Sequence, residues 1–82
     1  MKIVICVDYS HKQFNKDFEV SNRLIEVGHH VFLAINRVQF EYFRGNCDLC
    51  VNGYSGACEE NLIEIGDYSV DEAVEYITQI QI

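Results

Sequence analysis

The last 36 residues of this 82-residue chain contain no lysine or arginine, although eight of them are aspartate or glutamate. The first 46 residues carry all six basic side chains and the other five of the thirteen acids, so the net charge of −7 divides into +1 and −8. A long acidic stretch creates a negative potential that attracts basic surfaces and repels nucleic acids and anionic membranes. The acidic stretch therefore favours a basic protein partner and argues against direct binding to nucleic acid or membrane. The alternative is that its charge only keeps a small domain in solution.

Several other features are missing. The chain has no proline and no tryptophan, no low-complexity run, no signal peptide, and no apolar stretch of the roughly 18 residues that a membrane span needs. A hydrophobic content of 49% is too high for a disordered chain. We therefore expect a single compact domain over residues 1–82, located in the cytoplasm.

The first 35 residues predict a strand, a helix and a second strand. The β-branched run KIVICV at residues 2–7 is typical of a strand covered on both faces. Apolar residues at helical spacing then predict a helix over residues 11–27, which Gly28 ends. The run HVFLAI at residues 30–35 predicts a second strand, parallel to the first.

The middle of the chain is less regular. Alternating apolar residues over 38–43 predict a third strand, and LIEI at 62–65 predicts a last short one. Between them, Asn52 and Gly53 form a turn signal that would join a strand over residues 47–51 to a following strand as a hairpin. A loop tied by a metal ion is the alternative.

The C-terminal part predicts a helix. Ser69 and Glu72 form a capping box in front of an apolar stripe that continues to Ile80. The predicted fold class is α/β (α+β), a small two-layer sandwich that starts β-α-β and continues with short strands and a C-terminal helix.

The sequence LIEVGHHVFLA at residues 24–34, which follows MKIVICVD, resembles the opening strand, helix and strand of GT-B type glycosyltransferases and related surface-carbohydrate enzymes. The resemblance implies a Rossmann-like unit and, for the chain as a whole, a domain that binds a nucleotide sugar or carbohydrate. The loop 8–10 lacks the glycine-rich phosphate cradle of a nucleotide-binding first turn.

Three cysteines form the clearest local cluster. Cys47 and Cys50 have the spacing of two thiolates on one Zn²⁺ ion, and Cys58 would be a third ligand. The fourth ligand would come from Cys6, His29, His30 or Glu59. The alternatives are a zinc-stabilised interaction module, or free cysteines that fill a small core without any cofactor.

Asp8 and Ser10 follow the first strand, at the edge where α/β folds bind ligands. Tyr9 and His11 lie beside them in the sequence, but the best partner for an Asp–His pair, His29 or His30, opens the second strand and is expected at the opposite edge. Ser10 is better explained as a helix cap than as a nucleophile. We therefore predict no catalytic residues and a protein that is not an enzyme.

Carboxylates and tyrosines alternate in the acidic half, a composition that suits docking against an arginine-rich groove. The predicted partner-binding residues are Glu59, Glu60, Glu64, Asp67, Glu75, Tyr54, Tyr68 and Tyr76. This predicts a small inhibitor or regulator of a basic, nucleic-acid-handling protein, as in phage anti-CRISPR proteins, which act in the host cytoplasm. Phe40, Tyr42 and Phe43 would suit a homodimer interface, or else belong to the core.

Overall fold

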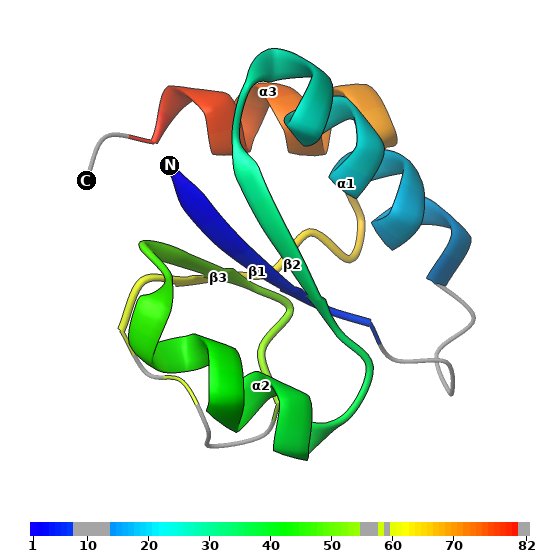
Figure 1. The fold of residues 1–82 in the computed structure, drawn as a ribbon. Helices are drawn as coiled ribbons and strands as arrows, with labels where there is room; N and C mark the ends of the chain where they lie inside the picture. Colours follow the sequence, from blue (N-terminus) through cyan, green and yellow to red (C-terminus); the bar gives the residue numbers. More distant parts are fainter. Residues whose placement is uncertain (8–13, 55–57, 59, 81–82) are drawn as a thin grey trace.

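The computed structural model describes residues 1–7, 14–54, 58 and 60–80 and contains one four-stranded parallel sheet (Figure 1). The strands are β1 (Lys2–Cys6), β2 (His30–Ala34), β3 (Leu49–Val51) and β4 (Leu62–Ile63), in the order β2-β1-β3-β4. The predicted α/β class and the parallel pairing of the first two strands are confirmed. The described residues contain no helix that is long and apolar enough to cross a membrane.

Strand β1 lies at the centre because both of its faces are apolar. Ile3, Ile5 and Val7 point to one face of the sheet, whereas Val4 and Cys6 point to the other. All five are at most 1% exposed. A strand without polar positions is stable only when both of its faces are covered, as the KIVICV run predicted.

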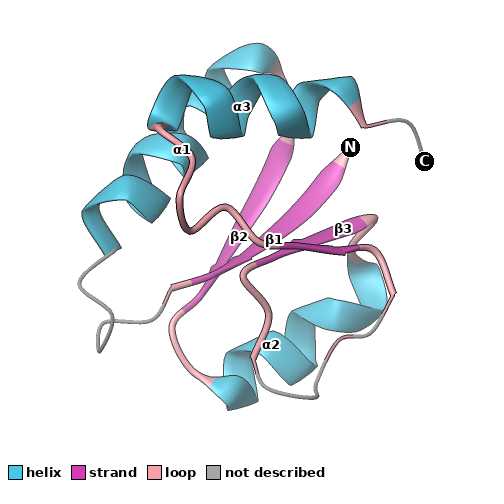
Figure 2. Cartoon of the chain, turned by 180° about the vertical axis from the view of Figure 1, so that it is seen from behind, coloured by secondary structure: helices cyan, strands magenta, loops and turns pink. Residues whose placement is uncertain are grey.

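Two helices cover the first face, α1 (Phe14–Val27) and α3 (Val70–Gln79) (Figure 2). Leu24 of α1 and Ile77 of α3 are fully buried there. The predicted end of α1 is confirmed by Gly28, whose φ of 110° is unfavourable for a residue with a side chain. The start predicted at residue 11 lies outside the described residues. The Ser69–Glu72 capping box of α3 is present in both directions.

The prediction of a strand over residues 38–43 is wrong, because this segment is helix α2 (Arg37–Phe43). Asn36 caps it by accepting a hydrogen bond from the Gln39 backbone N–H at 2.9 Å, and the Gln39 side chain accepts one from the Ile35 N–H. A local cap of this kind outweighs a short alternation of apolar residues. Helix α2 buries Phe40 against the second face of the sheet, so the fold has a third layer beyond the two expected (Figure 1).

The predicted hairpin at Asn52-Gly53 is also wrong, since β3 and β4 are parallel. Asn52 does adopt a positive φ of 58°, as its turn signal indicates. Its side chain then donates to Asp17 at 2.9 Å and accepts from the Ile65 N–H at 3.2 Å. These bonds hold the chain just after β3 and just after β4. A two-residue hairpin turn would need no such contacts.

Candidate functional site

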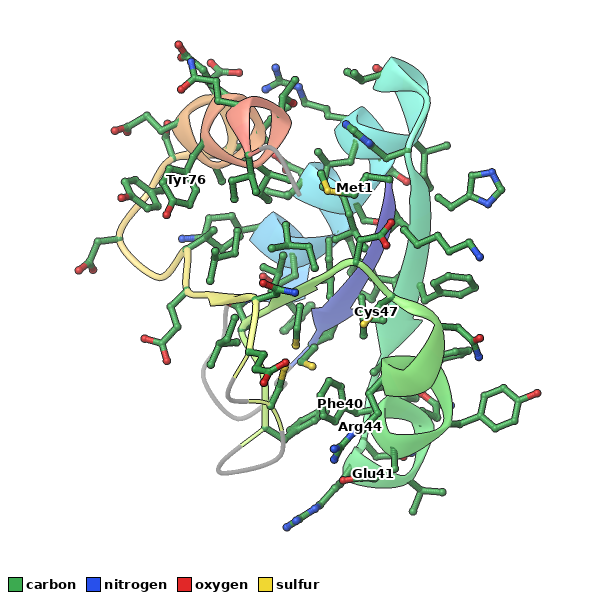
Figure 3. All side chains as sticks on the ribbon, turned by 90° about the vertical axis from the view of Figure 1, so that its left-hand side faces the viewer. Met1, Phe40, Glu41, Arg44, Cys47 and Tyr76 are labelled. Carbon is green, nitrogen blue, oxygen red and sulfur yellow. The ribbon has the colours of Figure 1, made fainter. Side chains whose placement is uncertain are left out.

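Exposed carboxylates lie on both sides of the edge strand β4 in the sequence and continue onto α3. Figure 3 shows this side of the molecule, where oxygen-tipped side chains extend along the yellow and orange part of the chain around Tyr76. Four of the five predicted carboxylates are exposed, and Glu59 lies outside the described residues. We call this region, residues 60–80, the acidic segment; the predicted carboxylates exposed in it are Glu60, Glu64, Asp67 and Glu75, and Asp71 and Glu72 of the first turn of α3 are exposed as well.

Two of the predicted tyrosines lie together within the acidic segment. The rings of Tyr68 and Tyr76 are stacked, with centroids 5.6 Å apart and an interplanar angle of 24°. They remain 39% and 42% exposed, so each ring presents both apolar surface and an accessible edge to a partner. Stacked, exposed tyrosine rings beside carboxylates form a surface on which a guanidinium group can stack and pair.

The third predicted tyrosine, Tyr54, lies elsewhere. Its hydroxyl donates to the carbonyls of Ala34 at 2.7 Å and Val7 at 3.3 Å, and its ring packs edge-on against Phe40. Tyr54 therefore joins the ends of β1 and β2 beneath helix α2. The structure does not bring it together with Tyr68 and Tyr76.

Two basic side chains of α1 contact the acidic segment, and both are already engaged. Lys16 of α1 donates to three backbone carbonyls, those of Ile65, Gly66 and Tyr68, at 2.5 to 3.2 Å. Arg23 pairs with Asp71 at the start of α3. Among the described residues, neither cation forms an ion pair with Glu60, Glu64, Asp67 or Glu75. Sequence reasoning missed Lys16, since its three acceptors are main-chain atoms about 50 positions away.

All four cysteines lie on the α2 side of the sheet, in or around one apolar cluster. The Sγ atoms of Cys6 and Cys50 are 4.0 Å apart and buried. Cys58 donates to the Glu60 carbonyl at 3.0 Å, and Cys47 contacts the Arg44 carbonyl at 3.4 Å. No three metal-ligating side chains among the described residues, these four thiols included, are gathered to hold an ion. The zinc site stays a prediction.

The pKa is raised for three of these thiols, those of Cys47, Cys50 and Cys58. The hydrogen bond with Cys6, followed by burial, raises the pKa of Cys50 far above its ordinary value. Burial is the main cause that raises the pKa of Cys47 and of Cys58, with Cys50 as the next. Cys50 is also buried, and a buried thiol with a raised pKa reacts slowly with oxidants and alkylating agents, as expected of a residue that packs in the core.

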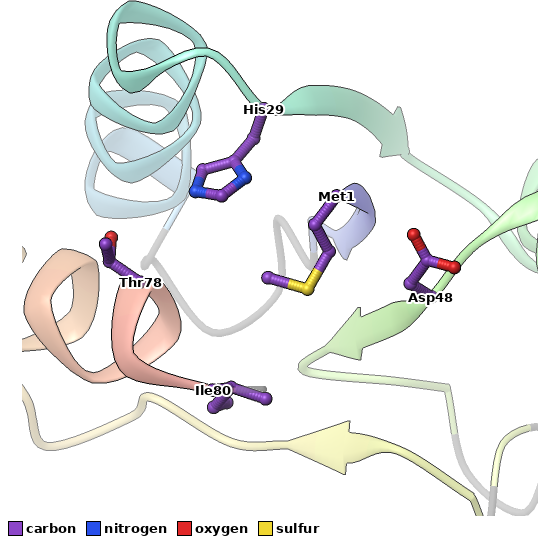
Figure 4. A pocket seen from close by; sticks show the side chains of 5 residues that line it. All are labelled: Met1, His29, Asp48, Thr78 and Ile80. Carbon is purple, nitrogen blue, oxygen red and sulfur yellow. The ribbon is translucent and has the colours of Figure 1, made fainter. Parts of the chain in front are cut away.

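Asp8 and Ser10, which follow β1 at its carboxyl end, lie outside the described residues. At the opposite edge, His29 lines a pocket of about 340 Å³ together with Met1, Asp48, Thr78 and Ile80 (Figure 4). The buried Nε2 atom of His29 has no hydrogen-bond partner among the described residues. Asp48 accepts from the Lys2 N–H at 2.9 Å and thereby joins β1 to the start of β3.

No known protein family, curated protein or solved structure matches this chain. The glycosyltransferase resemblance of residues 1–35 remains a prediction. Among the candidate sites described above, the acidic segment combines exposure, charge of one sign and paired aromatic rings.

Proposed function

We propose that this protein is a small, non-enzymatic binding protein whose acidic segment docks on a basic, nucleic-acid-binding partner and inhibits or regulates it. The observation that carries the proposal is the set of exposed carboxylates around the Tyr68–Tyr76 stack, of which Glu60, Glu64, Asp67 and Glu75 form no ion pair with a described residue. Such a surface offers a basic groove the negative charge that it normally receives from phosphates, together with rings on which arginine stacks. A phage-encoded inhibitor of host defence, of the anti-CRISPR kind, is the specific role we propose.

The mechanism is competition. The carboxylates occupy the groove, and nucleic acid is excluded because both ligands need the same lysines and arginines. The attraction operates between exposed charges, so the affinity falls steeply as salt screens them. The stacked tyrosines add apolar contact that salt does not weaken.

The test is affinity capture from a lysate of the source or its host, with washes at low and then high salt and identification of the eluted protein by mass spectrometry. We expect a nucleic-acid-binding protein that high salt or an added DNA duplex releases. The double variant Glu64→Lys/Glu75→Lys should lose this capture, because it reverses charge within the acidic segment.

The matched control is Glu19→Lys/Glu26→Lys, which makes the same change in net charge on exposed positions of α1. It should capture the partner as the wild-type chain does. Equal capture by both double variants, or capture that does not depend on salt, would show that the acidic segment is not the docking surface.

A further inference from the structure

The apolar surface of the molecule gathers around the edge strand β2, far from the acidic segment. Of the seven large hydrophobic residues that are exposed among the described residues, five lie between residues 25 and 42: Ile25, Val27, Ile35, Val38 and Tyr42. This stretch contains the end of α1, strand β2 and most of α2. Exposed apolar residues gathered at one open sheet edge are typical of an interaction surface.

On the same side, the backbone of β2 has hydrogen-bonding groups that pair with no other described strand, because β2 is an edge strand. The His30 N–H donates to the Met1 carbonyl, and the Ala34 carbonyl accepts from the Val7 N–H, so these two residues face β1. In a parallel pair, alternate residues face opposite ways. Val31 and Leu33 therefore direct their N–H and C=O groups to the open edge.

An aromatic row continues this edge onto α2. The Phe32 ring of β2 stacks on Phe43 at 5.1 Å, and Phe43 contacts the edge of Tyr42 at 5.4 Å. Phe32 is the central residue of the strand, and Tyr42 is 78% exposed. Phe40, in contrast, is fully buried, so only Tyr42 and Phe43 of the three aromatic residues on this helix are available to a partner.

We propose that β2 pairs with β2 of a second copy of this chain, antiparallel about a two-fold axis at Phe32. Val31 of each copy then exchanges both of its hydrogen bonds with Leu33 of the other, which satisfies the outward groups with four bonds. The two Phe32 side chains become a close cross-strand pair and extend the aromatic row across the axis. The result is a continuous eight-stranded sheet.

The distribution of charge favours self-association through β2 over self-association through β4, the other edge of the sheet. Residues 14–46 carry four bases and four acids and are neutral overall, whereas residues 60–80 carry six acids and no base. Pairing through β4 would place two acidic segments against each other, and like charges at close range are destabilising. Pairing through β2 keeps them at the two far ends of the sheet, because β2 and β4 are its opposite edges.

The test is light scattering coupled to gel filtration over a series of protein concentrations. We expect a particle of twice the 9.5 kDa chain mass. Val31→Pro removes an outward N–H without taking a bond from the β1–β2 ladder, and it should raise the dimer dissociation constant about tenfold or more. Circular dichroism checks that the variant folds.

If Val31→Pro does not fold, a second variant, Tyr42→Lys, tests the proposal. Tyr42 is a largely exposed position on α2, so the variant should fold, and it should also raise the dimer dissociation constant. Its matched control is Tyr76→Lys, an exposed tyrosine on α3 beside the other edge, which should leave the dimer intact. In the wild-type dimer the amide protons of Val31 and Leu33 should exchange more slowly as concentration rises. A chain that stays at 9.5 kDa throughout, or a dimer that Tyr42→Lys and Tyr76→Lys weaken equally, would overturn the proposal.

Discussion

Single residues decide how the acidic half is held against the rest of the molecule. Lys16 reaches from α1 to three carbonyls of the loop between β4 and α3, while Asn52 connects Asp17 to the start of the same loop. Hydrogen bonds from a charged donor are stronger than those between neutral groups. The loop that displays Asp67 and Tyr68 is therefore positioned by a cation that does not neutralise the carboxylates.

At the same scale, Cys50 makes the free energy of unfolding depend on pH in the alkaline range. Its pKa is raised in the folded state by the hydrogen bond with Cys6 and by burial, so the folded chain holds a proton that the unfolded chain releases. This contribution to stability is complete below the unfolded pKa of about 8.5 and is lost as the pH rises above it. The free energy of unfolding should fall by up to about 1.4 kcal/mol per pH unit for this thiol.

Urea denaturation of wild type and Cys50→Ala between mildly acidic and alkaline pH measures this slope. The variant is less stable throughout because it leaves a cavity, but its stability should decline less steeply above the unfolded pKa of the thiol. Parallel declines in the two proteins would mean that the thiol is not the group responsible.

At the scale of elements, the end of α1 depends on backbone conformation more than on space. Gly28 and Gly45 both have open space where a Cβ atom would lie, but only Gly28 has a positive φ. Gly28→Ala should therefore lower the free energy of unfolding by about 1 kcal/mol or more, and Gly45→Ala should change it by less than about 0.5 kcal/mol or raise it slightly. Thermal and urea unfolding of the two variants measure the difference, and equal losses would contradict this explanation.

The elements that could be predicted from the sequence are those that local signals determine. Strand β1 and helix α3 follow from an uninterrupted apolar run and from a capping box with its stripe. Helix α2 was missed because seven residues with alternating apolar positions also fit one face of a helix, and the Asn36 cap was the only local signal to decide between them. The parallel β3–β4 pair depends on Asn52 bonding to Asp17, 35 positions away, which no local pattern indicates.

The same distinction applies to the candidate site. The exposure of Glu60, Glu64 and Asp67 follows from their charge, because carboxylates without partners stay in water. The stacking of Tyr68 on Tyr76 and the hydrogen bond from the Tyr54 hydroxyl to the Ala34 carbonyl depend on which elements pack together. Composition therefore identified the acidic segment but did not separate its surface tyrosines from the structural one.

At the scale of the whole molecule, the separation of charge has an energetic cost. The six carboxylates of residues 60–80 repel one another, and salt reduces this repulsion. Raising the salt concentration should therefore increase the thermal stability of the wild-type chain, by about 1 kcal/mol or less. The gain should shrink in Glu64→Lys/Glu75→Lys and persist in Glu19→Lys/Glu26→Lys. Scanning calorimetry over a salt series measures it, and identical gains in the two variants would refute the electrostatic explanation.

The strand order has a consequence for synthesis on the ribosome. The central strand β1 is made first, but β3 follows more than 40 residues later, and α3, which covers the face of Ile3 and Ile5, follows only at residues 70–79. Until that helix emerges, the nascent chain holds an apolar sheet face that only α1 covers. Long-range parallel pairing of this kind is slow and prone to aggregation. The newly made chain should therefore depend on chaperone binding until its last helix is available.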